Sequence, residues 1–236
     1  MIEQLIRKLE RYAPLSAAER ATLQALPVKL REYSRGDVIV QQGSTPNESV
    51  LLMAGITFRY KMLKGGSRQI VAVQVPGDFV DLHCFVLKPI DHEIAAGSPV
   101  RVGRVPHSAI EAILEKHPRL VRALMWDMAV DGAISREWLA AQGRRSAYEQ
   151  LAHFFCELYF RMRWAGLVKD GSFELSMTQA ELGDACGLST VHVNRSIQAL
   201  RKDALIILED HILTIPDIAA LTQVANFDPA YLHILE

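Results

Sequence analysis

Residues 177–203, MTQAELGDACGLSTVHVNRSIQALRKD, constrain the fold of this chain more than any other segment. They have the pattern of a helix, a three-residue turn and a second helix. Gly183 predicts a close approach of the two helices, and Gly187 supplies a turn conformation that a Cβ atom would oppose. The apolar residues are spaced so that two steeply crossing helices share a small core: Leu182, Cys186, Leu188, Val193 and Ile197. The segment therefore predicts a helix-turn-helix unit.

The second helix of this unit carries a polar outer face. Ser189 is placed to cap the helix, and Arg195 is able to donate two hydrogen bonds to the edge of a guanine base. Val191 cannot accept from a cytosine amino group, although it can contact a thymine methyl group. The residues that we expect to contact double-stranded DNA are Ser189, Thr190, Val191, His192, Asn194, Arg195 and Gln198. The alternative is an ordinary helical hairpin with a solvated face, which the turn glycine, the cap and the spacing disfavour.

The charge distribution gives this interpretation mixed support. Residues 144–236, which include the unit, carry eight basic and twelve acidic side chains, a net charge of −4. Neutralisation of phosphates usually supplies much of the affinity for DNA. The basic side chains that could form a local positive surface are Arg144, Arg145, Arg195, Arg201 and Lys202.

Between residues 28 and 106 the chain has short β-rich runs separated by turn signals. The runs are VIVQQ, SVLLM, ITFRYKML, RQIVAVQV and VRVGRV, and Gly65-Gly66 marks a hairpin tip. Many short strands at this spacing favour a sandwich or barrel-like roll over a parallel sheet. Helical segments flank the region, and Ser16 and Glu19 are spaced as a capping box.

A long helix is predicted after Pro118, ending near Gln142 before a hinge at Gly143-Arg144-Arg145. Apolar residues recur at three- and four-residue steps: Leu120, Leu124, Met128, Ile134 and Trp138. A helix of about 24 residues would be about 36 Å long. Its apolar side chains need packing partners along this whole length. We favour a parallel coiled coil between two subunits, with these residues in the interface. The alternative is a helix that lies against the roll.

After the hinge, Ser146 and Glu149 form a second capping box before an amphipathic helix, and LIILEDHILTI follows the helix-turn-helix as a wing. The predicted fold is α+β, with an antiparallel β-roll of the double-stranded β-helix or jelly-roll kind, a long dimerisation helix and a C-terminal winged helix-turn-helix. We place the domains at residues 1–117, 118–143 and 144–236.

This order resembles that of the CRP/FNR family of bacterial transcription regulators. The resemblance covers about residues 20–215 and is carried by RGDVIVQQG, PGDFV, SAYEQLAHFF and TQAELGDACGLSTVHVNRSIQALRKDALI. It implies a homodimer that binds a pseudo-palindromic operator, with each second helix in the major groove. It also implies RNA polymerase as a further partner.

The resemblance speaks against cyclic AMP as the effector. Cyclic-nucleotide-binding members of the family hold the ribose with a Gly-Glu pair after a PGDF-type turn and the phosphate with an Arg-Ser or Arg-Thr pair. This chain has Asp81 near the glutamate position, and Asp91 and His92 where the arginine pair belongs. A carboxylate there would repel a cyclic phosphate. For an unidentified effector, the candidate pocket residues are Asp81, His83, Asp91, His92, Ser135 and Arg136.

No cofactor or metal site is predicted. The iron–sulfur branch of the family uses N-terminal cysteines, and this chain has none before Cys84. A heme-bearing branch ligates iron just after the same turn, where His83 and Cys84 stand, but Asp81 occupies its cysteine position. Soft sulfur beside imidazole suits iron or zinc. The simpler interpretation is that the two side chains alternate on a strand, with the cysteine buried and inert.

Two other classes of function are alternatives to a DNA-binding regulator. A heme- or metal-dependent sensor could signal through protein contacts, with the winged domain as a docking module. An enzyme is not expected, because the chain has no P-loop, no G-x-S-x-G elbow and no H-E-x-x-H motif. Three scattered cysteines, no signal peptide and no apolar stretch of about 20 residues predict a cytoplasmic protein without a membrane partner.

Overall fold

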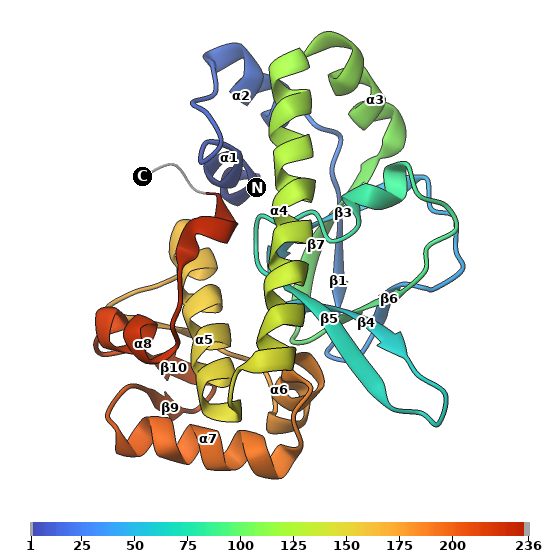
Figure 1. The fold of residues 1–236 in the computed structure, drawn as a ribbon. Helices are drawn as coiled ribbons and strands as arrows, with labels where there is room; N and C mark the ends of the chain where they lie inside the picture. Colours follow the sequence, from blue (N-terminus) through green and yellow to red (C-terminus); the bar gives the residue numbers. More distant parts are fainter. Residues whose placement is uncertain (1, 234–236) are drawn as a thin grey trace.

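The computed structural model describes residues 2–233, arranged as a β-roll, a long helix and a C-terminal helical domain (Figure 1). Two short helices, α1 (Glu3–Leu9) and α2 (Ala17–Gln24), precede the roll, and they lie beside the first half of the long helix in Figure 1. The capping box of Ser16 and Glu19 is present as predicted. The mixed α+β architecture is confirmed.

The roll consists of two antiparallel sheets. One has the order β1 (Lys29–Tyr33), β7 (Val100–Pro106), β3 (Glu48–Ala54), and the other β2 (Val38–Val40), β6 (Glu93–Ala96), β4 (Thr57–Met62), β5 (Arg68–Gln74). The β4–β5 hairpin turns at Gly65 and Gly66, whose φ angles are +101° and +84°. Strands β1 and β6 were not among the predicted runs, because β1 is largely exposed and polar and β6 has only four residues.

The long helix α4 (Pro118–Arg144) follows α3 (His107–Lys116) and has 27 residues, which corresponds to about 40 Å. It continues through Gly143 and Arg144, so the helix breaks only at Arg145, the last of the three residues expected to form the hinge. The helix ends where Arg145 adopts extended backbone angles, and Ser146 then caps α5 (Ala147–Trp164) with the predicted capping box. The break between the helices therefore lies two residues after Gly143.

The C-terminal domain contains the expected helix-turn-helix and wing. The remaining elements are β8 (Ser172–Glu174), α6 (Gln179–Cys186), α7 (Thr190–Lys202), β9 (Ile207–Glu209), β10 (Ile212–Thr214), α8 (Ile218–Val224) and the 3-10 helix η2 (Pro229–Leu232). The wing strands pair in the order β8-β10-β9, and the β9–β10 hairpin turns at Asp210 and His211, both at positive φ. The final segment returns to the long helices, where the Tyr231 hydroxyl donates to Glu157 over 2.9 Å.

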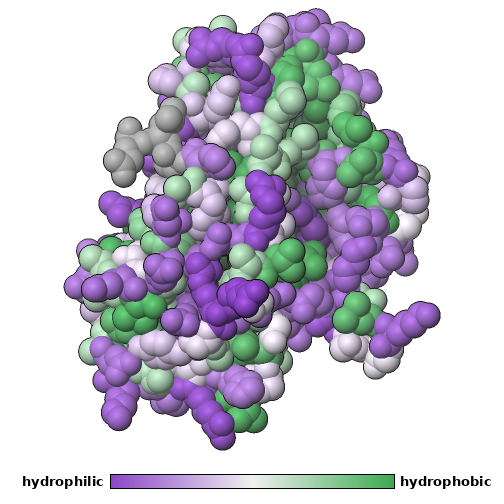
Figure 2. Space-filling view, viewed as in Figure 1, coloured by the Kyte–Doolittle hydropathy of each residue, from purple (hydrophilic) through white to green (hydrophobic). Residues whose placement is uncertain are grey.

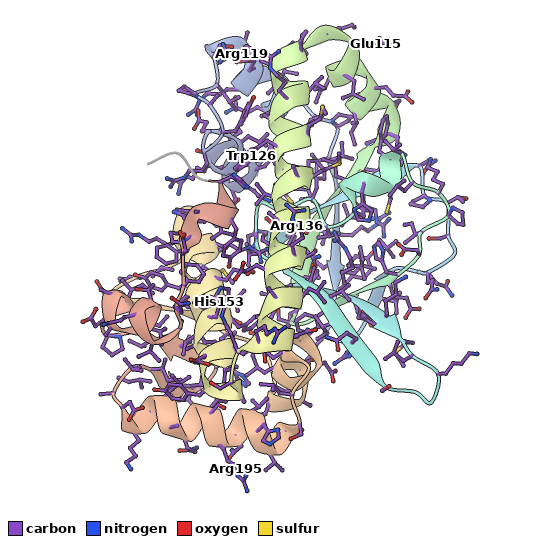
Figure 3. The ribbon with its side chains drawn as sticks, viewed as in Figure 1. Glu115, Arg119, Trp126, Arg136, His153 and Arg195 are labelled. Atoms are coloured by element: carbon purple, nitrogen blue, oxygen red, sulfur yellow. The ribbon has the colours of Figure 1, made fainter. Side chains whose placement is uncertain are left out.

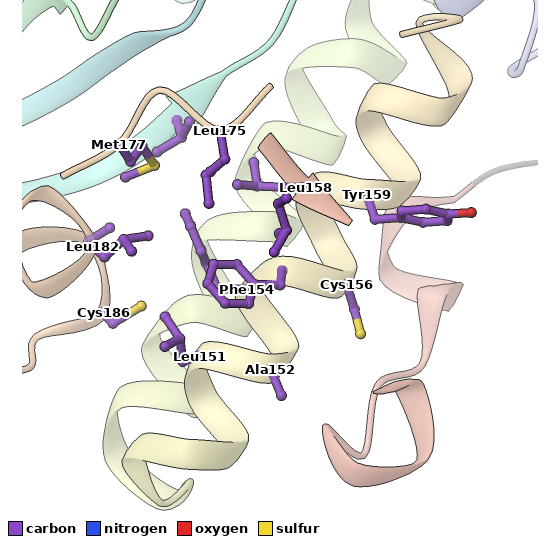
Figure 4. Packing of buried hydrophobic residues seen from close by; sticks show 14 of the residues in the cluster. Leu151, Ala152, Phe154, Cys156, Leu158, Tyr159, Leu175, Met177, Leu182 and Cys186 are labelled. Carbon is purple, nitrogen blue, oxygen red and sulfur yellow. The ribbon is translucent and has the colours of Figure 1, made fainter. Parts of the chain in front are cut away.

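Helix α5 forms the centre of the C-terminal core. Its Leu151, Phe154 and Leu158 belong to one apolar cluster with Leu182 and Cys186 of α6 (Figure 4). The same apolar cluster continues into β4 and β5 of the roll, so the two domains share packing rather than only a linker. Over residues 2–233, no helix combines the length and the apolar character that crossing a membrane requires.

Candidate nucleic-acid interface and ligand cavity

The helix-turn-helix owes its geometry to its two glycines. Gly187 ends α6 at a φ of +66°, the left-handed conformation that favours glycine. A Cβ atom on Gly183 would lie 2.6 Å from the carbonyl oxygen of Leu188, so only glycine permits this close approach. Thr178 and Glu181 cap the first helix reciprocally. The predicted roles of both glycines are confirmed.

Helix α7 presents the predicted polar face to solvent. Ser189 caps the helix by accepting from the backbone amide of His192, at 3.3 Å. Arg195 points away from the body of the molecule (Figure 3). The side chains of this face are all exposed, namely Thr190, Val191, His192, Asn194, Arg195 and Gln198, whereas Val193 and Ile197 are buried. The exposed face of α7 is sterically accessible to a DNA groove.

The predicted dimer interface is wrong for four of its five residues. Leu120, Leu124, Ile134 and Trp138 are buried within their own chain, where they pack on the roll, the N-terminal helices and α5. The Trp138 indole N–H donates to the buried Glu157 over 2.9 Å. Only Met128 faces outward. The apolar stripe seen in the sequence is therefore the intramolecular face of α4.

A different stripe of α4 is open to solvent. It consists of Val121, Met125, Met128, Gly132, Ser135 and Leu139, at alternating four- and three-residue steps. Val121 and Gly132 are half-buried, and the other four are exposed. Met125 is 59% exposed and Leu139 is 73% exposed, both unusual for large apolar side chains. In Figure 2 hydrophobic atoms follow the upper part of α4 between hydrophilic flanks. We call these six residues the outer stripe.

A cavity of about 370 Å³ lies between the roll, α1, α4, α5 and η2. Three of the predicted pocket residues, His83, Asp91 and His92, line it. Asp81 does not, because it is fully buried beneath the roll, where it accepts from the amide of Val50 over 2.6 Å and burial raises its pKa to about 7.

The two predicted contacts from the long helix also lie outside the cavity. Ser135 donates to the carbonyl oxygen of Asp131 in its own helix, and Arg136 is exposed. The residues of α4 that do line the cavity include Asp127, Asp131 and Gly132. The part of α4 that lines the cavity therefore lies beside Ser135 and Arg136 but does not include them.

Charged side chains that the sequence did not single out form one wall of this cavity. Asp78, in the PGDF turn, accepts from Lys8 of α1 over 2.6 Å and from Arg161 of α5 over 2.8 Å. Arg161 also pairs with the buried Glu157 over 3.0 Å. Burial alone would raise the pKa of Asp78, but the charges of Lys8 and Arg161 outweigh it and lower the pKa to about 2. We call Lys8, Asp78, Arg161 and Glu157 the interdomain network.

A second ionic link joins the roll to α4. Arg59 on β4 donates to Asp131 over 2.7 Å and to the carbonyl oxygen of Val80 over 2.8 Å. The family's phosphate-binding pair lies in the segment after the PGDF turn, whereas Lys8, Arg59 and Arg161 come from other elements. Only the tertiary fold brings them to the cavity.

The C-terminal domain also contacts the outer edge of the roll. Arg68 on β5 pairs with Asp184 on α6 over 2.8 Å, and Gln69 donates to the Asp184 carbonyl oxygen over 2.6 Å. Arg35 pairs with Glu181 and donates to the carbonyl oxygen of Ser176 over 2.8 Å. Acidic groups of α6 are thus engaged by the roll, on the side away from the polar face of α7.

Comparison with known families matches both parts of the chain. Residues 30–117 match the model of a cyclic nucleotide-binding domain, and residues 149–224 match that of a Crp-like helix-turn-helix domain. The chain is 26% identical over 222 residues to the transcriptional activator protein FnrL of Cereibacter sphaeroides, covering 92% of this chain and 88% of the relative. It is 28% identical to a probable transcriptional activator of Rhizobium leguminosarum bv. viciae, covering 83% and 81%.

The fold is similar to that of solved regulators. The structure of FixK2 from Bradyrhizobium japonicum superimposes with a TM-score of 0.73 at 22% sequence identity, covering 84% of this chain and 98% of that one. Both the order of the domains and their architecture are shared.

Proposed function

Because this chain belongs to the CRP/FNR family of transcription regulators, we propose that it acts as a homodimer that reads a two-fold pseudo-palindromic operator with α7. The family consists of transcription regulators rather than enzymes. The observation that carries the proposal is the exposed polar face of α7 on a helix that is capped at Ser189 and held by the turn at Gly187. In a dimer, two such helices reach successive turns of the major groove.

The net negative charge of the C-terminal domain does not oppose this proposal. Glu157, Glu181 and Asp184 are paired with arginines on the inner side of the domain. Asp217 and Asp228 accept from backbone amides as helix caps. These carboxylates are therefore compensated, and they lie on elements other than the face that would meet phosphates.

For the dimer, we assign the outer stripe of α4 as the seam. Its spacing is that of the a and d positions of a heptad, which suits a parallel pair of helices. Gly132 at the middle of the stripe allows the two backbones to approach closely. The opposite face of α4 packs on its own chain, so the helix lies against the roll and is also available for pairing.

The cavity is our candidate for the effector site. It is bounded by the roll, by α4 and by Arg161 and Trp164 of the C-terminal domain. A ligand there contacts both domains at once, so its binding would shift the population of dimers whose α7 helices match the operator. RNA polymerase is the further partner that such a regulator requires, and we assign no surface to it.

Operator selection from random DNA, followed by binding titrations, tests the central proposal. Arg195→Ala is expected to weaken specific binding by about 1–3 kcal/mol, roughly 5- to 150-fold. Lys64→Ala removes the same charge from the exposed β4–β5 hairpin and is the matched control. Equal affinities of the two variants would exclude α7 as the recognition helix. A protein without preference over random competitor DNA would instead favour a sensor that signals through protein contacts.

A further inference from the structure

His83, Cys84 and His92 gather beside the cavity, although seven residues lie between Cys84 and His92 in the sequence. One potential ligand atom from each lies within 4.8 Å of the other two. His83 and Cys84 belong to the 3-10 helix η1 (Leu82–Phe85), so the expectation that they alternate on a strand is wrong. The irregular turn places both side chains toward the loop before β6.

The His92 ring is oriented as in a metal site. Its Nδ1 lies 2.8 Å from a carboxylate oxygen of Asp91, which in turn pairs with Lys61 over 2.7 Å. That bond leaves Nε2 as the available nitrogen, and Nε2 is buried without a hydrogen-bond partner among residues 2–233. A carboxylate that fixes the second nitrogen of a histidine is the usual outer support of a metal ligand.

The donor set favours one class of ion. Two imidazoles and a thiol suit zinc and similar ions, whereas magnesium and calcium need oxygen ligands. Around a tetrahedral zinc ion, such ligand atoms are about 3.3–3.6 Å apart, so small side-chain rotations from the present arrangement are sufficient. Cys84 is 1% exposed and His92 is 4% exposed, which shields the position from bulk water.

We propose that His83, Cys84 and His92 bind a zinc-like divalent transition-metal ion. Coordination displaces the thiol proton of Cys84 to solvent, so the ion is held by one thiolate and two neutral imidazoles. The fourth coordination position faces the cavity that His83 and His92 line, where water or a small ligand can occupy it. The proposal is independent of the DNA-binding function.

Cobalt(II) is the probe for this site, because its spectrum reports thiolate ligation directly. The full-length protein is treated with a chelator and titrated with Co²⁺, and native mass spectrometry counts the ions per chain. We expect one ion per chain, a thiolate-to-cobalt charge-transfer band in the near ultraviolet, and loss of the band when Zn²⁺ is added. Absence of that band in the wild-type protein would overturn the proposal.

Matched variants locate the site. Cys84→Ser is expected to abolish the charge-transfer band, whereas Cys156→Ser, which alters another buried cysteine, is expected to retain it. His92→Gln should weaken Co²⁺ binding at least 10-fold, and Asp91→Asn should weaken it about 10- to 100-fold through the outer support. Circular dichroism confirms that each variant is folded. A band that survives in Cys84→Ser, or Co²⁺ affinity that is unchanged in His92→Gln, would show that the ion binds elsewhere.

Discussion

Arg161 of α5 donates a hydrogen bond of 2.8 Å to Asp78 in the turn that follows β5. Both side chains are largely withdrawn from solvent, with 11% and 7% of their surfaces exposed. The pair connects the C-terminal domain to the roll at the wall of the cavity. The orientation of α5 is therefore tied to the same carboxylate that also holds Lys8 of α1.

Removing Arg161 should destabilise the protein strongly. Arg161→Met leaves Asp78 and Glu157 buried with less compensating charge, and loss of one partner from such a network lowers the free energy of unfolding by about 3–5 kcal/mol. Arg163→Met is the control, since Arg163 lies on the same helix but is exposed. Denaturant titration measures both variants. Equal stability of the two would mean that the interdomain network contributes nothing in solution.

The low pKa of Asp78 predicts a specific loss of stability in acid. Its pKa is about 2 in the folded protein, against 3.8 without the protein environment. A depressed pKa gives stabilisation that is complete above about pH 4 and is lost as the pH falls through 2. The difference between the two pKa values corresponds to about 2 kcal/mol in the free energy of unfolding. Unfolding free energies measured between pH 2 and 5 should show this dependence in the wild-type protein and a flatter one in Asp78→Asn.

The identity of residue 191 should influence the base preference of the operator. Val191 is 58% exposed at the start of α7, where it can contact a thymine methyl group but cannot accept from cytosine. In Val191→Glu, the carboxylate accepts from a cytosine amino group, so the preferred base at one position of each half-site should change. Operator selection with both proteins measures this change. An identical selected sequence would show that residue 191 does not face the bases.

The sequence predicted the helix-turn-helix well because its signals are local. The cap at Ser189, the turn at Gly187 and the close contact at Gly183 depend on residues a few positions apart. The same holds for the capping boxes and the β4–β5 hairpin.

The faces of α4 could not be assigned in this way. Both Leu124 and Met125 are apolar, and only the tertiary fold decides which of them is buried. The more regular-looking stripe packs inward, and the outer stripe includes Gly132 and Ser135, which carry little hydrophobic signal. The interdomain network was missed for a similar reason, since its members lie on α1, the PGDF turn and α5. Their approach depends on how the domains pack.

The outer stripe makes a direct prediction about the oligomer. Leu139→Asp places a charge in the proposed seam and should raise the dimer dissociation constant at least 10-fold. Leu139 makes little contact within its own chain, so the fold of each subunit should persist. Val86→Asp is a matched control, because Val86 is 72% exposed and lies on a different element, at the end of the 3-10 helix η1. Sedimentation velocity measures both. A dimer that is unaffected by Leu139→Asp but lost in Val86→Asp would move the interface to the roll.

Two glycine-to-alanine substitutions should have opposite effects on stability. At Gly143 a Cβ atom meets nothing within 4 Å, and alanine favours the helical backbone by about 0.5–1 kcal/mol, so Gly143→Ala should raise the free energy of unfolding. At Gly183 the same helical preference is outweighed, because the new methyl group would lie 2.6 Å from the backbone oxygen of Leu188. Separating α6 from α7 to relieve this contact should lower stability by about 1–3 kcal/mol and weaken operator binding. Thermal unfolding of both variants shows whether their changes in stability relative to the wild type have opposite signs. A Gly143→Ala protein that is less stable than the wild type would show that Gly143 leaves the helical conformation in solution, as a hinge at this residue requires.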